Sequence, residues 1–259
     1  MANTIYENFI LQDKYNSVLS TALNMNQFMT VDTSLAAEDG MTIKINTRTV
    51  TGSAEDVAMG EGNTGDVEVT TVTVPYEVIT TQARAKYHDE EVQTDSKAID
   101  NLLTGLSETM INDYTAKAIA EFEKATQHVD YATAIDFNAV VDALGYFPER
   151  EEGLFMLMGP DSLAAFRKGL KDDLKYVEDF ARKGYIGSVC GVPVYVSKAV
   201  PAGKAFVANK SAITLFVKKD ATIEQERDAN TRVNTVYARR VGLVALTDAS
   251  KVVMIQKQA

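Results

Sequence analysis

A glycine-rich segment is the first part of the sequence whose spacing suggests chemistry. Residues 60–65 read GEGNTG and match the G-x-G-x-x-G pattern of phosphate-binding loops. That pattern binds a dinucleotide when a strand precedes it and a helix follows it, because the pyrophosphate then meets the N-terminus of the helix. Here a segment rich in valine and threonine follows, and Glu61 and Asp66 would repel a phosphate. We therefore interpret these residues as a turn in which glycine permits unusual dihedrals, and not as a nucleotide site.

The histidines and the single cysteine offer little for a metal site or for nucleophilic catalysis. His88 and His128 are the only histidines, and they lie forty residues apart without a nearby cysteine. Zinc sites need several such ligands close together, so no metal site is expected. Cys190 lies in an apolar segment, SVCGV, which predicts a buried and unreactive thiol. We therefore expect a protein that is not an enzyme and has no cofactor.

The charge of the chain is strongly uneven. The net charge is -10; residues 1–150 carry 9 basic and 24 acidic side chains, whereas residues 201–259 carry 10 basic and 5 acidic ones. An acidic protein is a poor general binder of nucleic acid, because phosphate contacts need lysine and arginine. Two interpretations stay open: a solvated surface, or acidic and basic surfaces that meet between subunits.

The second interpretation names candidate contact residues. A compact subunit gains nothing from separated charges, but the acidic segment of one subunit can lie near arginines of a neighbour. Each exposed pair would contribute at most about 1 kcal/mol, repeated over many neighbours. The candidates for contacts between subunits are Arg48, Glu55, Asp56, Glu61, Asp66, Arg227, Arg232, Arg239 and Arg240.

The acidic candidates lie in what the pattern predicts to be a long hairpin. Residues 41–50 alternate apolar and polar side chains, and residues 66–80 are rich in valine and threonine, so both are expected to be strands. The glycine-rich, acidic residues 51–65 would form the tip. An isolated two-stranded hairpin is marginally stable in water. It therefore needs a surface to lie on, and another subunit can supply one.

A long helix and an α+β part complete the expected organisation. Apolar residues recur at helical spacing over residues 95–125, a rod of about 45 Å. Residues 1–30 look like an arm, too short to bury their own apolar side chains. No stretch approaches the roughly 20 apolar residues that a membrane span needs. Further elements are expected as helices at 137–144 and 161–169, the second with Leu163, Ala164 and Phe166 inward, and as strands at 154–158, 192–197, 205–208, 213–217, 222–227, 231–246 and 251–256.

The order of these parts resembles the Hong Kong 97-type coat fold of tailed bacteriophages. Residues 153–166 (GLFMLMGPDSLAAF) look like its axial-domain strand and helix, and residues 231–257 resemble its C-terminal strands. Residues 186–203 resemble its G-x-P-V-x-x-S-x-x-V-P stretch, the most specific piece. The resemblance implies an α+β fold with an N-terminal arm (1–34), an E-loop hairpin (35–85), a peripheral domain with a spine helix (86–132), an axial domain (133–221) and returning strands (222–259).

The function implied by the resemblance is mechanical. A major capsid protein of this type self-assembles into hexamers and pentamers, forming an icosahedral head shell that encloses double-stranded DNA without sequence-specific binding. The implied partners are other copies, a separate scaffolding protein and a portal, with no membrane. The virion would be its location, after assembly in the cytoplasm of the host bacterium. An encapsulin-type nanocompartment shell is the alternative, and a cytoplasmic α+β enzyme is a remote one.

Two departures from the family affect these expectations. Some relatives carry an N-terminal scaffolding segment that is cleaved off, whereas this sequence begins directly with the arm, so scaffolding is expected from a separate protein. Some relatives also crosslink a hairpin lysine to a neighbouring subunit. Residues 45–83 contain no lysine, so a donor for that crosslink is absent from this hairpin.

Overall fold

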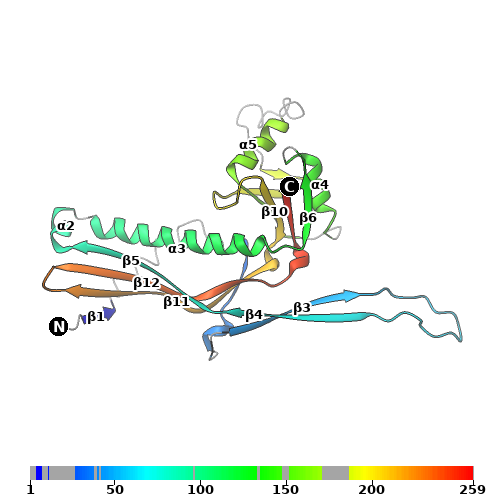
Figure 1. The fold of residues 1–259 in the computed structure, drawn as a ribbon, viewed down its shortest axis with the longest axis horizontal. Helices are drawn as coiled ribbons and strands as arrows, with labels where there is room; N and C mark the ends of the chain where they lie inside the picture. The colour runs from blue at the N-terminus through cyan, green and yellow to red at the C-terminus, as the bar shows by residue number, and fades with distance from the viewer. Residues whose placement is uncertain are drawn as a thin grey trace.

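The structure is a computed structural model that describes residues 4–7, 11, 27–37, 40, 42–95, 97–132, 135–147, 152–170 and 187–258. The remaining residues, which include most of the expected arm, lie outside the description. The molecule is elongated: one long helix lies along a narrow sheet, a compact part stands at one end of that sheet, and a hairpin projects beyond it (Figure 1).

The helices and strands have the following bounds. The helices are α2 (Asp89–Thr94), α3 (Ala98–Phe122), α4 (Phe137–Leu144) and α5 (Pro160–Gly169), with short 3-10 turns η2 (Ser34–Ala37), η3 (Lys210–Ala212) and η4 (Ala249–Lys251). The strands are β1 (Thr4–Glu7), β2 (Thr30–Asp32), β3 (Thr42–Thr51), β4 (Glu68–Glu77), β5 (Ile79–His88), β6 (Gln127–Tyr131), β7 (Leu154–Met158), β8 (Ser188–Val189), β9 (Val192–Val196), β10 (Lys204–Asn209), β11 (Ile213–Asp228), β12 (Val233–Leu246) and β13 (Val252–Lys257).

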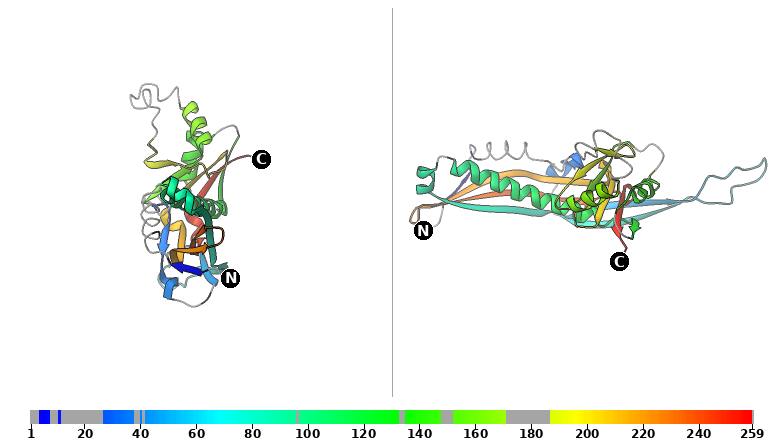
Figure 2. Two further views of the ribbon diagram at one scale, coloured as in Figure 1. Left: turned by 90° about the vertical axis from the view of Figure 1, so that its left-hand side faces the viewer. Right: turned by 90° about the horizontal axis from the view of Figure 1, so that it is seen from above.

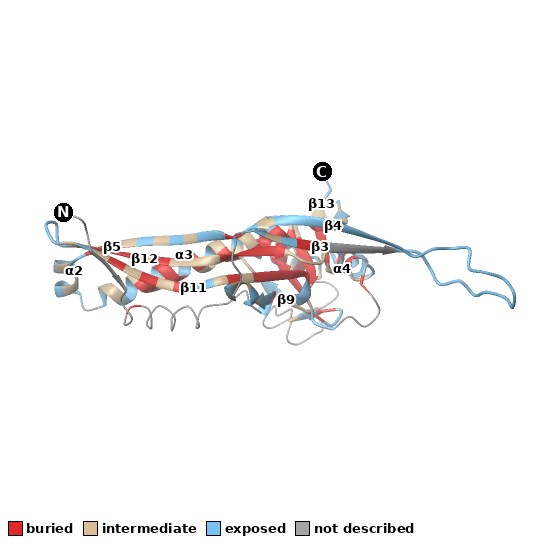
Figure 3. Cartoon of the chain, turned by 90° about the horizontal axis from the view of Figure 1, so that it is seen from below, coloured by how far each residue is buried: buried red, intermediate tan, exposed pale blue. Residues whose placement is uncertain are grey.

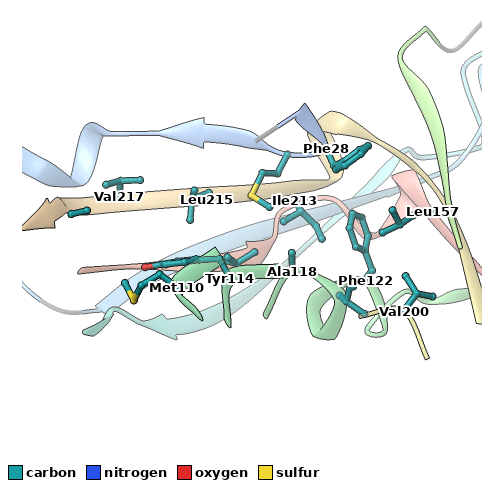
Figure 4. Packing of buried hydrophobic residues seen from close by; sticks show 14 of the residues in the cluster. Phe28, Met110, Tyr114, Ala118, Phe122, Leu157, Val200, Ile213, Leu215 and Val217 are labelled. Carbon is teal, nitrogen blue, oxygen red and sulfur yellow. The ribbon is translucent and has the colours of Figure 1, made fainter. Parts of the chain in front are cut away.

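The narrow sheet is built around two long antiparallel strands, β11 and β12. β12 also pairs antiparallel with β5, while β11 pairs antiparallel with β1 and parallel with β2. Successive side chains of a strand point to opposite faces, so only alternate residues meet the long helix α3. The expected apolar stripe of that helix is confirmed. Figure 4 shows the helix residues Met110, Tyr114 and Ala118 facing Ile213, Leu215 and Val217 of β11.

The compact part is a six-stranded sheet with strand order β6-β13-β10-β7-β9-β8. Both of its faces are buried. In β10, Phe206 and Ala208 belong to the core under α3, whereas Ala205 and Val207 belong to the core beside α4 and α5. Strands buried on both faces read as continuous apolar runs, which is why LFMLM was recognisable as a strand. Phe122, the last residue of α3, stacks on Phe206 with ring centroids 5.7 Å apart and so joins the two parts.

The hairpin is a separate two-stranded sheet of β3 and β4, paired antiparallel over ten residues each. Seen from above, it extends away from both other sheets (Figure 2, right). Its base packs on the end of β12 through a small cluster of buried residues: Ile45, Val78, Leu243 and Ala245. Val78 alone separates β4 from β5, so the chain passes from the hairpin into the narrow sheet through a one-residue link.

Several expected boundaries differ from the structure. The strand expected at 66–80 is two strands in different sheets, because the chain changes partner at Val78. The strands expected at 213–217 and 222–227 are one strand, β11, because a bulge interrupts the pattern of side chains but not the pairing. In α5, Leu163 and Phe166 are buried as expected, but Ala164 is exposed and Ser162 takes its place inside.

Candidate assembly surfaces

The tip of the hairpin, residues 52–67, is an exposed loop closed by one carboxylate. Glu55 accepts hydrogen bonds from the backbone N–H of Thr64 at 2.9 Å, from the hydroxyl of Thr64 at 2.9 Å and from the N–H of Gly65 at 3.2 Å. These donors, the Thr64 N–H first, hold the pKa of Glu55 below its usual range. The side-chain amide of Asn63 also donates to the carbonyl of Gly65 at 2.6 Å. The tip therefore has internal structure although it is solvent-exposed.

The other predicted hairpin contacts lie in the same region. Asp56, Glu61 and Asp66 are exposed in the tip, which contains four acidic residues and no basic ones. Glu55 is the one whose carboxylate is committed to bonds inside the loop. Arg48 lies in β3 opposite Thr71, and its side chain is outside the description. The tip therefore presents a concentrated negative charge to whatever it meets.

The hairpin also exposes apolar side chains along its length. In Figure 3, β4 and the tip are exposed almost throughout. Met59 in the tip is fully exposed, and an isolated hairpin with such a surface is marginal in water. Neither β3 nor β4 pairs with a third strand among those described, so both outer edges are open for contact. The other exposed apolar residues here are Val57, Val67, Val69, Val72, Val74 and Ile79.

Of the five predicted arginines, four belong to the C-terminal part of the chain, and two of these four, Arg227 and Arg232, lie where β11 turns into β12. Arg227 forms an ion pair with Asp89 at 2.8 Å, and Arg232 forms one with Glu90 at 2.8 Å. Asp89 also accepts a hydrogen bond from the side chain of Asn234 at 2.6 Å. The bonds from Arg227 and then Asn234 hold the pKa of Asp89 below its usual range. These charges attach α2 to the end of the narrow sheet.

The other two arginines lie in the middle of β12. Arg239 forms an ion pair with Glu224 at 2.7 Å. The guanidinium of Arg240 lies over the ring of Tyr114, 4.9 Å from its centroid, and 3.9 Å from a carboxylate oxygen of Asp220. All four arginines therefore already face a carboxylate of their own chain. A neighbour's acid would have to compete with that partner.

The structure does not bring the acidic tip and the arginines together within one subunit. The β11–β12 turn with Arg227 and Arg232 lies at one end of the molecule, and the hairpin tip lies at the other (Figure 1). Any pairing between the two groups must therefore join different copies of the chain. That pairing stays a prediction.

A carboxylate that the sequence reasoning missed lies at the base of the hairpin. Glu121 of α3 has a side chain only 11% exposed. It accepts bonds from Lys124 Nζ at 2.5 Å and from the backbone N–H of Leu246 at 3.2 Å. The hydroxyl of Tyr76 donates to it at 3.4 Å. The sequence did contain one indication of this buried carboxylate: Glu121 directly precedes Phe122 on the apolar stripe of the helix.

The structure also shows the surroundings of the residues that were considered for a metal site or for nucleophilic catalysis. Within the described ranges, no group of three His, Cys, Asp or Glu side chains is placed to hold a metal ion. The prediction of a buried thiol is wrong, because Cys190 is exposed. It occupies the turn between β8 and β9 with φ 51°, followed by Gly191 with φ 82°, a geometry typical of tight hairpin turns. No helix among the described residues is long and apolar enough to cross a membrane.

Comparisons with known proteins place this geometry among viral coats. No model of a known protein family matches the sequence. The chain is 22% identical to the major capsid protein of Staphylococcus phage phiMR11, over 96% of this chain and 92% of that protein. It superposes on a structure from Mycobacterium phage Che8 with a TM-score of 0.67 at 12% identity, over 98% of this chain and 93% of the other.

Two further structures come from other particles. The capsid of a native GTA particle matches with a TM-score of 0.72 at 14% identity, over 91% of this chain and 90% of the other. A virus-like particle from Pyrococcus furiosus matches with a TM-score of 0.64 at 12% identity, over 96% and 98%. At these identities the structures establish the fold. The predicted recognition is confirmed: the chain has the Hong Kong 97-type coat fold and is similar, over nearly its whole length, to a phage major capsid protein.

Proposed function

We propose that this chain is the major capsid protein of a tailed bacteriophage, repeated in hexamers and pentamers to form the icosahedral head shell. The observation that carries the proposal is the hairpin. Its strands of ten residues leave the body of the subunit, expose valines along β4 and end in an acidic tip. Such an element gains stability by lying on another subunit.

The placement of the hairpin suits a closed ring of subunits. Within one subunit, the hairpin tip lies far from the body. When the tip of one subunit binds the body of the next, the contact therefore joins different surfaces of the two partners. Contacts of this heterologous kind generate rings when the rotation closes. The core under α3 runs from the narrow sheet into the compact sheet through Phe122 and Phe206. A subunit with one continuous core can carry load between its contacts without bending at a domain boundary.

The role proposed for the chain inside the particle is containment and not catalysis. Its net charge of -10 disfavours tight binding to phosphates, so packaged double-stranded DNA would be enclosed without sequence-specific contacts. Scaffolding protein and portal would be separate chains. Assembly would take place in the cytoplasm of the host bacterium, and the mature protein would belong to the virion.

An encapsulin-type nanocompartment shell is the competing function. The fold alone does not separate the two, since phage capsids and a virus-like particle both match it. The full-length similarity in sequence to a phage major capsid protein favours the phage shell.

Electron microscopy of the purified protein tests the proposal. We expect round, closed shells, and heads isolated from phage lysates should contain this chain around nuclease-protected DNA. Shells that enclose a cargo protein instead would favour the nanocompartment. Particles of one or two chains at every protein concentration would refute both shell functions.

A further inference from the structure

Two side chains from the body of the subunit reach the base of the hairpin, one toward each strand. Glu121 of α3 accepts a hydrogen bond from the hydroxyl of Tyr76, near the end of β4. Lys218 of β11 donates to the carbonyl of Gly40, which precedes β3. The two contacts come from different elements: one reaches β4, and the other reaches the backbone just before β3.

The nearly buried carboxylate of Glu121 requires polar partners. A carboxylate that is nearly buried is unfavourable unless charged or polar donors surround it. Here Lys124, the backbone of Leu246 and the hydroxyl of Tyr76 supply those donors. The ammonium of Lys124 also lies 5.4 Å from the centre of the Tyr76 ring. Burial, and then the charge of Glu121, raise the pKa of Tyr76 above its ordinary value of 10.0.

The contact at Lys218 depends on an irregularity in β11. Val217 pairs with Gly242 and Lys219 pairs with Val241, so Lys218 is the extra residue of a bulge. A bulge re-aims one side chain out of the regular alternation of the strand. In this structure the re-aimed side chain is the one that reaches the hairpin.

Apart from these two contacts, the direction of the hairpin depends on its apolar base and on a one-residue link. The base contains four buried residues with further apolar side chains packed against them, and Val78 alone joins β4 to the sheet. An open groove of about 600 Å³ adjoins the base, lined in part by Tyr76, Ile79 and Glu121. The groove leaves room for the hairpin to swing toward α3.

We propose that Glu121 and Lys218 are positioning residues that set the angle at which the hairpin leaves the subunit before a neighbour binds. The inference rests on the proposed shell function, because the hairpin angle decides where on the next subunit it lands. In a ring of identical contacts, a change in that angle decides whether the ring closes. An element held in its bound direction also loses less entropy on association.

Distance measurements between spin labels test the angle directly. Labels at Thr70→Cys in β4 and Asn101→Cys in α3, in a Cys190→Ser background, report how the hairpin lies relative to the helix. In dilute, unassembled subunits we expect one narrow distance distribution for the parent and broader ones for Tyr76→Phe, Glu121→Gln and Lys218→Met. Distributions equal to the parent's in all three variants would overturn the proposal.

Matched controls separate positioning from general loss of a bond. Tyr131→Phe removes a hydroxyl that donates to Gly203 at 2.7 Å, and Glu123→Gln removes a carboxylate paired with Lys204 at 2.7 Å. Neither bond involves a hairpin residue, so both variants should keep the narrow distribution. Broadening in these controls equal to that of Tyr76→Phe would also overturn the proposal.

Assembly of the parent and the variants distinguishes the positioning role from the proposed shell function. We expect the parent to form closed shells of uniform diameter, and the three positioning variants to lose that uniformity while melting near the parent temperature. Uniform shells from all three would overturn the positioning role even if the proposed function stands. A parent that shows the narrow distribution but forms no shells would refute the proposed function and leave the positioning intact.

Discussion

Gly242 of β12 lies directly against the backbone carbonyl of Phe216 on β11: a Cβ built on Gly242 would be 2.5 Å from that oxygen. The close approach occurs beside the bulge at Lys218. Backbone cannot move aside as a flexible side chain can, so Gly242→Ala must shift the strand. We expect it to lower the free energy of unfolding by about 1–3 kcal/mol, measured by chemical denaturation.

Gly105 provides the matched control for that substitution. It lies on the exposed face of α3, and nothing is within 4 Å of a Cβ built there. Alanine is favoured over glycine in a helix interior by roughly 0.5–1 kcal/mol, so Gly105→Ala should stabilise the subunit. A shift of both variants in the same direction would contradict the role assigned to the contact with Phe216.

Removal of the hairpin tip separates folding from assembly. Deleting residues 55–65 removes exposed residues whose hydrogen bonds, such as Glu55 to Thr64, are local. The subunit should therefore melt near the temperature of the full chain, yet form no shells. Calorimetry and electron microscopy measure the two outcomes. The interpretation is wrong if the shortened chain does not fold, or if it still builds complete shells.

The acid sensitivity of the subunit should begin at the end of the narrow sheet. The pKa of Asp89 is lower in the folded chain than its ordinary value of 3.8, because of Arg227 and then Asn234. Its contribution to stability is therefore present above pH 3.8 and is lost as the pH falls through the lower folded value. Hydrogen exchange in α2 should accelerate in that range. Asp89→Asn should exchange faster at neutral pH and show a weaker pH dependence; an unchanged acid profile would argue against this ion pair.

The parts of the fold with regular periodicity could be predicted from the sequence. The stripe containing Leu103, Leu106 and Met110 predicted α3 because a helix repeats its apolar face every three to four residues. The run Leu154–Met158 predicted a strand buried on both faces. The sequence predictions failed at single residues whose environment depends on parts of the chain distant in the sequence.

Val78 and Cys190 illustrate such failures. No local pattern indicates that the chain changes sheets at Val78, since strands of the same character lie on both sides of it. The apolar neighbours of Cys190 suggested burial, but its place in a tight turn directs it to solvent. The contact of Glu121 with Tyr76 joins residues 45 positions apart, and only the packing of α3 on the hairpin base brings them together.

High salt should weaken assembly if contacts between subunits pair the acidic tip with arginines such as Arg227 and Arg232. The Debye length falls to about 3 Å at 1 M salt, which screens exposed charges. Light scattering across a salt series should therefore show slower assembly at 1 M. The internal partners Asp89 and Glu90 limit this effect, because a neighbour's acid must compete with them. Assembly that is unchanged or faster at high salt would contradict charge pairing and indicate that apolar burial dominates.

A reconstruction of the assembled shell at side-chain resolution tests the central claim most directly. We expect the hairpin of each subunit to lie along a neighbouring subunit, with Val72 and Val74, which share one face of β4 and are exposed in the single chain, buried at that contact. Hairpins that project freely into solvent, or that fold back onto their own subunit, would contradict it.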